Sequence, residues 1–382
     1  MTESELISQG SYGCVYKPGL KCNSNDKINK KEITKLQLIN KFSLKEMKIS
    51  DKIINEIKGY KKYYAPIKRS CEVDIKEVGD KIKECKVVDN EEETFILNKM
   101  DYAGDKTLIN MLFETKKKSN SLFLRHYFLT MIKLFDGIER LNKINIIHLD
   151  IKGNNVIYSE AHSNPIIIDF GLSLDLDDYN DQKDDVFFTY GADYEPWCID
   201  LGMITYIIEN KIENVEINDS TMKLHIEKVI EDYVKDNTSV LEKNREDMKK
   251  RLIVYFGENF MNKNFGEMIE ILLKNAKTWD VHSLIVVYYH FILSSLSEND
   301  GNINLTDNTE IRDMIDDMES YILSVPGERE SLEKMREKMM GHYKNVMLKE
   351  KIATKLLIKR DISEEEVAHN LTLKSILELR KD

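Results

Sequence analysis

Two short polar motifs near the middle of the chain constrain its fold more than any other feature. The first is His148-Leu-Asp-Ile-Lys-Gly-Asn-Asn155, and Asp169-Phe-Gly171 follows it directly after the apolar run 166–168. Together they supply an aspartate, a lysine two residues on, an asparagine five residues on, and a second aspartate. Transfer of a phosphoryl group needs such a set, namely a proton acceptor, a cation and oxygen ligands for Mg²⁺. The spacing therefore indicates phosphoryl-transfer chemistry.

The two motifs resemble the catalytic loop and the metal-binding loop of the eukaryotic-type protein kinases. This resemblance implies that Asp150 is the catalytic base, that Lys152 contacts the γ-phosphate of ATP, and that Asn155 and Asp169 hold Mg²⁺. A lysine at position 152 is typical of the Ser/Thr branch. The resemblance also implies an α+β, two-lobed fold with a β-rich N-terminal lobe and a mainly helical C-terminal lobe.

A glycine-containing segment at the start of the chain resembles the kinase phosphate-binding loop. Gly10, Gly13 and Val15 match the family pattern, whereas Ser8 stands in place of its first glycine. Glycines let a backbone lie against phosphates and donate its N–H groups. The run 100–102 resembles the hinge between the kinase lobes, where backbone groups bind adenine. The expected nucleotide contacts are Gly10, Ser11, Tyr12, Gly13, Val15, Lys35, Met100, Asp101 and Tyr102.

The resemblance also implies a catalytic lysine on the third strand, paired with a glutamate on the next helix. Lys35 is the candidate, with Lys30 and Lys31 as rivals, and the apolar spacing predicts the helix over 42–60. Glu56 is the expected partner because it lies 21 residues beyond Lys35, near the family's usual separation. Glu46, 11 residues beyond Lys35, is the alternative.

Later segments, at 193–196, 280–284 and 326–329, show weaker resemblance to kinase motifs. They imply a buried ion pair between Glu195 and Arg329. They leave two candidates for the residue that opens the central helix of the C-terminal lobe, Asp280 and Asp200. We favour Asp280, because the 49 residues from Asp280 to Arg329 are near the family's usual span.

The expected organisation follows from these positions. Residues 1–100 form the N-terminal lobe, 101–340 the C-terminal lobe, and 341–382 a helical extension. The 85 residues between Glu195 and Asp280 exceed the family's usual span, which predicts a helical insertion at about 207–276. In the N-terminal lobe we expect strands at 5–7, 14–16, 32–36, 86–88 and 94–100.

One departure from the family concerns regulation. Leu149 replaces the arginine that normally holds a phosphate on the activation loop, and six aspartates follow within 175–185. A phosphate added among carboxylates is repelled. We therefore predict that phosphorylation of this loop, with Thr189 as the nearest conventional site, does not switch the protein on.

The composition of the chain indicates which binding partners and which cellular compartment to expect. The net charge is −11, from 56 basic and 67 acidic residues, which fits poorly with direct nucleic-acid binding. Five widely spaced cysteines favour free thiols in a reducing compartment. The N-terminus is unlike a signal peptide, and the apolar stretch 284–293 is too short to span a bilayer. These features predict a cytoplasmic protein without a membrane partner.

The expected function is Mg²⁺-dependent transfer of the γ-phosphate of ATP to Ser/Thr hydroxyls of protein substrates. The alternatives are an ATP-binding pseudokinase scaffold and a small-molecule phosphotransferase of kinase-like fold, against which Lys152 argues. The helical insertion and tail could offer docking surfaces to a partner. The Lys-, Ile- and Asn-rich composition and divergent C-terminal lobe are similar to protein kinases of large DNA viruses, which would place the chain in the host cytoplasm or the virion.

Overall fold

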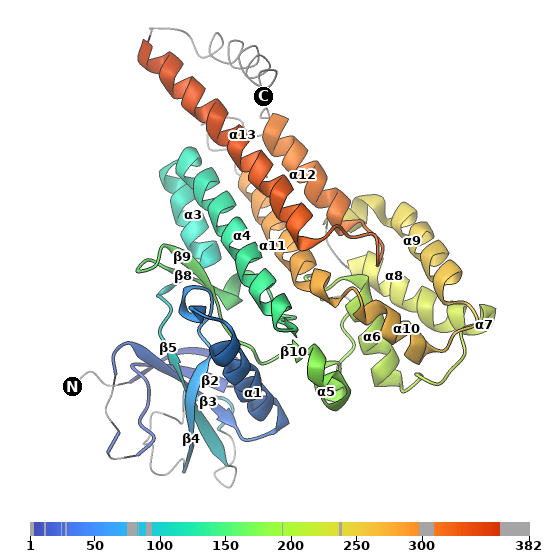
Figure 1. Ribbon diagram of the computed structural model, residues 1–382, viewed down its shortest axis with the longest axis horizontal. Coiled ribbons are helices and arrows are strands. Elements are labelled where there is room, and N and C mark those ends of the chain that lie inside the picture. Colours follow the sequence, from blue (N-terminus) through green and yellow to red (C-terminus); the bar gives the residue numbers. More distant parts are fainter. Residues whose placement is uncertain are drawn as a thin grey trace.

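The computed structural model describes residues 4–10, 13–23, 25–26, 29–74, 82, 84–88, 94–192, 194–236, 239–297 and 309–359. At residues 236, 239, 241–243, 297 and 350–359 it describes the backbone alone. The chain forms a β-rich N-terminal part and a mostly helical C-terminal part (Figure 1). The predicted two-lobed α+β fold is therefore confirmed.

A five-stranded antiparallel sheet of order β1-β2-β3-β5-β4 makes up the N-terminal part. Its strands are β1 (Glu5–Gly10), β2 (Gly13–Lys17), β3 (Glu32–Leu38), β4 (Ile67–Val73) and β5 (Phe95–Asp101). Side chains alternate between the faces of a strand, so Cys14, Tyr16 and Leu36 enter a buried core on the outer face. Val15 and Lys35 consequently point to the opposite face, where they line a cavity.

Helix α1 (Lys41–Glu56) packs beside the sheet (Figure 1). Asn40 begins it with a capping box, because its side chain accepts from the backbone N–H groups of Phe42 and Ser43 while Ser43 reaches back. Ile49 and Ile53 are buried in the same apolar cluster as residues of the C-terminal part. The helix predicted over 42–60 is confirmed, and it ends at Glu56.

The strand expected at 86–88 is wrong. That segment forms a turn closed by a hydrogen bond from Val88 N to Cys85 O, 3.0 Å. The fifth strand of the sheet is instead β4, in which only Ile67 and Val73 are buried and the side chains do not alternate regularly between buried and exposed. The sequence of β4 did not predict a strand because it is polar, as a strand at the edge of a sheet buries few of its side chains.

The C-terminal part is built on α4 (Asn120–Lys143) and α11 (Trp279–Ser297). Tyr127 Oη donates to Tyr288 O at 2.8 Å, and Tyr288 Oη donates to Thr130 Oγ1 at 2.8 Å, so buried hydroxyls link the two helices. The elements around them are β6 (Lys106–Thr107), α3 (Leu108–Lys118), β7 (Ile146–Ile147), β8 (Val156–Ser159), β9 (Asn164–Ile167), β10 (Leu174–Asp175), α5 (Tyr179–Val186), α12 (Thr309–Ile322) and α13 (Leu332–Lys359).

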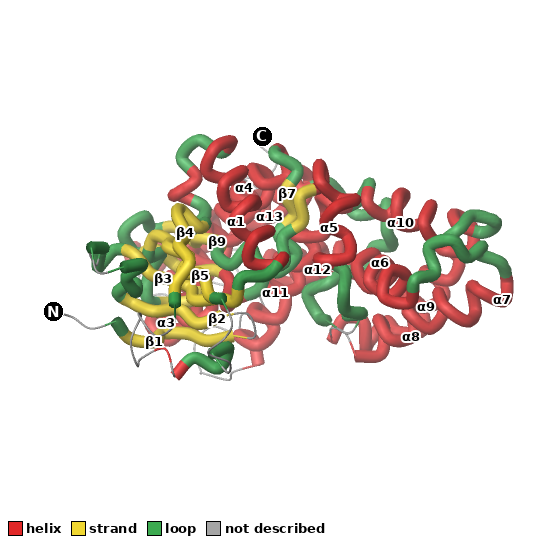
Figure 2. The backbone as a smooth tube through the Cα atoms, turned by 90° about the horizontal axis from the view of Figure 1, so that it is seen from below, coloured by secondary structure: helices red, strands yellow, loops and turns green. Residues whose placement is uncertain are grey.

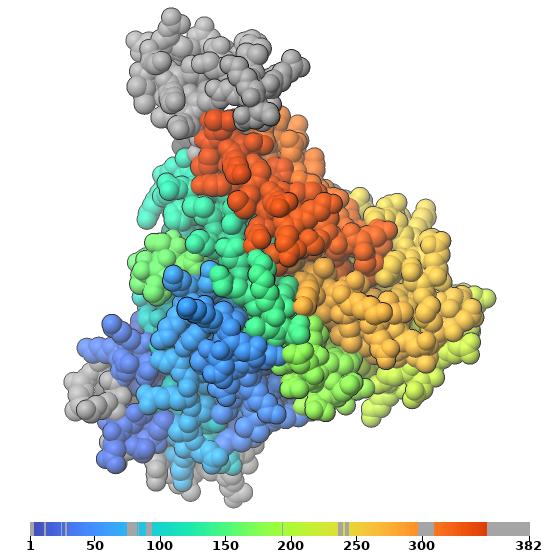
Figure 3. Space-filling view, in the orientation of Figure 1, coloured from blue at the N-terminus to red at the C-terminus, as the bar shows by residue number. Residues whose placement is uncertain are grey.

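Between α6 (Ile199–Asn210) and α11, the stretch in which we expect an insertion is folded as helices. They are α7 (Asp219–Thr221), a π-helix (Met222–Ile226), α8 (Glu227–Asp236), α9 (Ser239–Phe260) and α10 (Phe265–Leu273). Buried residues of the π-helix, α8, α9, α10 and α6 share a second apolar core. Figure 2 shows α7–α9 at the end of the molecule opposite the sheet, and in Figure 3 they project to the right of the N-terminal part.

The helix expected from residue 341 begins earlier, as α13 starts at Leu332, and residues 360–382 of the expected extension lie outside the described residues. None of the described helices combines the length and apolarity needed to cross a bilayer.

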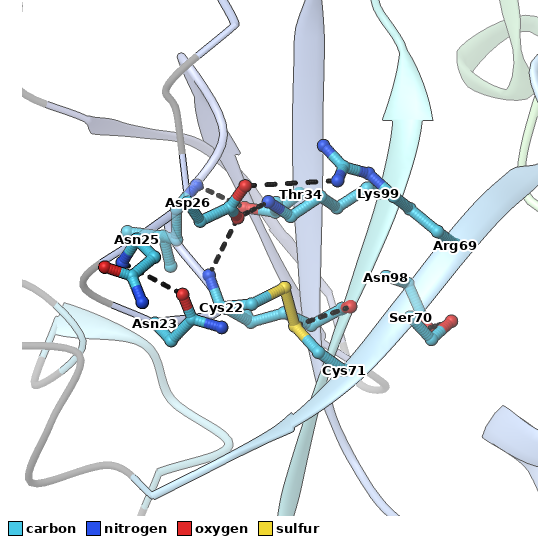
Figure 4. The surroundings of a disulfide bond; sticks show 12 residues. Cys22, Asn23, Asn25, Asp26, Thr34, Arg69, Ser70, Cys71, Asn98 and Lys99 are labelled. Carbon is cyan, nitrogen blue, oxygen red and sulfur yellow. Dashed lines mark hydrogen bonds and ion pairs between the residues drawn. A yellow bond between two sulfur atoms is a disulfide. The ribbon is translucent and has the colours of Figure 1, made fainter.

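The expectation of free thiols is wrong for four of the five cysteines. Cys14 is bonded to Cys85 and Cys22 to Cys71, whereas Cys198 is a buried free thiol. Figure 4 shows the Cys22–Cys71 disulfide, beside which the Asp26 carboxylate accepts from Cys22 N at 3.0 Å and pairs with Lys99. The free-thiol argument for a cytoplasmic location therefore no longer holds.

Candidate active site

The loop that carries Asp150 is held by hydrogen bonds to α11. Asp280, fully buried in the first turn of that helix, accepts hydrogen bonds from His148 N at 2.7 Å and Leu149 N at 2.9 Å. Burial raises the pKa of Asp280. Leu149 has a left-handed backbone (φ 63°), a strained state that persists only where its surroundings impose it. Asp280, and not Asp200, is therefore the aspartate that fixes this loop.

Asp150 is held by its neighbours on the same loop. Asn155 Nδ2 donates to Asp150 Oδ2 at 2.6 Å and to Asp150 O at 3.1 Å. Lys152 Nζ lies 3.0 Å from Asp150 Oδ1. The structure thus brings three of the predicted site residues together, with the Asp150 carboxylate between an amide and an ammonium group.

Tyr194 is a residue of this site that the sequence did not reveal. Its hydroxyl donates to Asp150 Oδ1 at 2.7 Å and accepts from Lys152 Nζ at 3.3 Å. Burial and the charge of Asp150 raise the pKa of Tyr194, so the phenol keeps its proton. In the sequence, the segment 193–196 shows only a weak resemblance to a kinase motif, which does not point to a role for Tyr194, and Asp193 lies outside the described residues.

Lys35 joins two acidic residues at the other side of the site. Its Nζ lies 3.1 and 3.0 Å from Glu46 Oε1 and Oε2, and 2.9 Å from Asp169 Oδ1. Burial alone would lower the pKa of Lys35, but Glu46 and Asp169 outweigh it and raise that pKa. Lys35 therefore stays charged between two carboxylates.

The expected pairing of Lys35 with Glu56 is wrong. Glu56 is the exposed last residue of α1, whereas Glu46 lies in the second turn and is buried. Gln37 Nε2 also donates to Glu46 Oε2, at 3.2 Å. Glu46 was the alternative in the sequence, and its position on the buried face of α1 decides between the two.

Asp169 and Asn155, the expected Mg²⁺ ligands, lie on two loops that are bonded to each other. Ile168 N donates to Asn155 O at 3.0 Å, which joins the two loops. The structure describes no hydrogen bond for Asn155 Oδ1 or for Asp169 Oδ2, so each offers an oxygen. Burial would raise the pKa of Asp169, but Lys35 keeps it lowered, so the carboxylate is ionised. Mg²⁺ in kinase sites is bound by one or two such groups together with phosphate oxygens.

A cavity of about 1090 Å³ lies between the sheet and the loop that carries Asp150. Its lining includes seven of the expected nucleotide contacts, namely Gly10, Gly13, Val15, Lys35, Met100, Asp101 and Tyr102. It also includes four of the residues expected to serve catalysis or to bind the metal, namely Asp150, Lys152, Asn155 and Asp169. Ser11 and Tyr12 lie outside the described residues. Any side chain at position 13 would place its Cβ 2.5 Å from Leu36 O, which explains the glycine there.

The expected Glu195–Arg329 ion pair is also wrong. Arg329 instead bonds to Asp200, and both side chains are buried. Glu195 is half-exposed and lies 3.1 Å from His290 Nδ1. Asp200 lies in the first turn of α6. The acidic partner of Arg329 is therefore five residues further along the chain than the expected Glu195.

The sheet with α1, the helical C-terminal part and the residues of this cleft together define a protein-kinase-like fold. In sequence, the chain is 31% identical over 85 residues to a probable serine/threonine-protein kinase, cdc7 of Dictyostelium discoideum. That match covers 21% of this chain and 8% of the relative, so the chain spans a small part of the relative's length. No family model matches the chain.

Similar solved structures include the BubR1 kinase domain, with a TM-score of 0.44 and 13% identity, covering 88% of this chain and 78% of that one. A Stt7 homolog from Micromonas algae, soaked with ATP, has a TM-score of 0.33 and 16% identity, covering 44% of this chain and 48% of its own.

Proposed function

We propose that the chain is an active Ser/Thr protein kinase, which transfers the γ-phosphate of ATP to hydroxyl groups of protein substrates. The observation that carries this proposal is the position of Lys35, which bonds both Glu46 and Asp169 at the wall of a cavity that also contains Asp150 and Asn155. A scaffold that merely binds a partner needs no such arrangement of charges.

Each of these residues has a task in the proposed reaction. Lys35, held by Glu46, contacts the phosphates of ATP, and the glycine-containing β1–β2 turn covers them. Asp150 orients the acceptor hydroxyl and takes its proton, while Lys152 contacts the γ-phosphate. Asn155 and Asp169 would hold Mg²⁺, which neutralises charge on the phosphates when bound.

Tyr194 favours acceptors that offer a large binding surface. Its hydroxyl already bonds Asp150 Oδ1, so an incoming hydroxyl must share or displace that contact. Asn155 engages the other carboxylate oxygen. The acceptor is therefore expected to bring enough binding surface to compete, which a peptide does more readily than a small molecule.

The test is transfer of labelled γ-phosphate to a generic basic protein, followed by phosphoamino-acid analysis. Phosphoserine or phosphothreonine in the acceptor, absent with Asp150→Asn, is the expected result. ATP binding without label in any acceptor would instead support the pseudokinase scaffold, and label only in small molecules would support the phosphotransferase.

A further inference from the structure

An acidic segment, residues 175–185, follows the Asp169 motif and contains six aspartates. Lys52, on α1, reaches its first part. The Lys52 ammonium lies 2.7 and 2.8 Å from the two oxygens of Asp175 and 2.8 Å from Asp177 Oδ2. Lys52 and Asp175 are both largely buried, with side-chain exposures of 17% and 10%. This pair is therefore better shielded from solvent than an ordinary surface ion pair.

The same segment also contacts the other end of the helix. Lys41, the first residue of α1, pairs with Asp185. Glu46 lies between Lys41 and Lys52 along the helix. The acidic segment thus bonds α1 on both sides of the residue that holds Lys35.

The acidic segment is itself anchored to the catalytic loop. Asp175 belongs to β10, which pairs with Ile146 of β7, and β7 leads directly into His148. Leu176 N donates to Asn145 O at 2.9 Å, and Asn145 Nδ2 donates to Asp177 Oδ1 at 2.8 Å. Contacts of Lys52 with this segment therefore connect α1 to the loop that carries Asp150.

We propose that Lys52 is a positioning residue, which through Asp175 and Asp177 holds α1 in the place where Glu46 meets Lys35. The negative charge comes from carboxylates that are always present, so no phosphate on the acidic segment is required. This inference rests on the proposed kinase function of the same site and specifies its regulation. Burial would lower the pKa of Lys52, but its bonds to Asp175 and Asp177 outweigh this and raise that pKa.

The test compares Lys52→Met with Lys52→Arg and with Lys48→Met, a matched control. Lys48 is an exposed lysine of the same helix, for which the structure describes no ion pair. Because small displacements of a positioning group are costly to catalysis, Lys52→Met should lower kcat/KM for ATP by about tenfold or more. Lys52→Arg should keep most of the activity, and Lys48→Met should change it by less than about twofold.

A second readout does not depend on catalysis. Hydrogen–deuterium exchange of the α1 amides should be faster in Lys52→Met than in the wild type and unchanged in Lys48→Met. If the wild type transfers no phosphate, the proposed function fails and exchange alone decides on Lys52. Wild-type exchange in Lys52→Met would overturn the inference, as would wild-type kcat/KM.

Phosphatase treatment tests the regulatory part. Wild-type protein freed of phosphate, and the Thr189→Ala variant, should both retain activity. Loss of activity in the dephosphorylated protein, restored by phosphorylation at residue 189, would contradict this part of the inference.

Discussion

Glu46 receives two hydrogen bonds from Lys35, whereas Glu56, at the end of the same helix, is exposed. Lys35 also holds Asp169, so the position of its ammonium group depends on a balance between two carboxylates. Removing the charge of Glu46 leaves Asp169 as the only acidic partner of Lys35 among the described residues. The ammonium group is then drawn toward Asp169.

We therefore predict that Glu46→Gln lowers kcat/KM for ATP by about 10²-fold, because misplacing a group that contacts the phosphates has an effect of this order. Glu56→Gln serves as the matched control and should change kcat/KM by less than about twofold. Steady-state kinetics on both variants measure this. Equal effects of the two substitutions would contradict the assignment.

The buried pair of Asp200 and Arg329 makes a prediction about stability. Asp200→Asn leaves the Arg329 guanidinium charged and buried without its acidic partner, which should reduce the free energy of unfolding by about 3–5 kcal/mol. Glu195→Gln, at the position first expected to pair with Arg329, should cost less than about 1 kcal/mol because Glu195 is half-exposed. Urea denaturation measures the free energy of unfolding of both variants. A larger loss in Glu195→Gln than in Asp200→Asn would refute the pairing of Asp200 with Arg329.

Lys45 gives a pH-dependent prediction. Its buried Nζ has no hydrogen-bond partner among the described residues, and burial lowers the pKa of Lys45 from 10.5 to about 8 although Asp185 and Glu46 oppose this. Between those two values the unfolded chain binds more protons than the folded one. The contribution of Lys45 to stability therefore rises with pH from about 8 to 10.5.

Lys45→Met should accordingly unfold with a free energy about 1–3 kcal/mol greater than the wild type at pH 7, because it buries no charge. This gain in the free energy of unfolding should be smaller at pH 9, where the Lys45 amine of the folded wild type loses its proton. Denaturant titrations of both proteins at the two pH values measure the difference. A gain that is independent of pH would show that Lys45 does not titrate as described.

The two disulfides predict a redox-dependent stability. They close loops with sequence separations of 71 and 49 residues, and a loop of this size stabilises a folded chain by roughly 4 kcal/mol in the chain-entropy account. Thermal unfolding with and without reductant should show a lower Tm on reduction. A variant with serine at positions 14, 22, 71 and 85 should not respond to reductant. An unchanged Tm of the wild type would argue against both bonds.

Most residues of the candidate site could be predicted from the sequence because they belong to contiguous motifs. Asp150, Lys152 and Asn155 lie within six residues, so their local spacing already places them on one loop, and Asp169 follows a recognisable strand. The strands β1, β2, β3 and β5 and the helix α1 were predictable for the same reason, since hydrophobic periodicity is a local property, whereas the polar edge strand β4 was not.

Contacts between distant segments were less predictable. Separation along the chain pointed to Glu56, although Glu46 continues the buried stripe of Ile49 and Ile53 and could have been found from that spacing. Nothing local distinguishes Asp200 as the partner of Arg329. The disulfides were not predictable, because cysteine spacing does not reveal which segments of the chain lie side by side in the fold.

The proposed function requires that Asp150 takes part in phosphoryl transfer and not merely in folding the loop. The most direct measurement is the Mg²⁺-dependent rate of γ-phosphate transfer by the wild type and by Asp150→Asn, with the ATP affinity of both determined on the same preparations. We predict ATP affinities within about threefold of each other and a rate at least about 10²-fold lower for the variant. Equal transfer rates, or a wild type that binds ATP and transfers nothing, would contradict it.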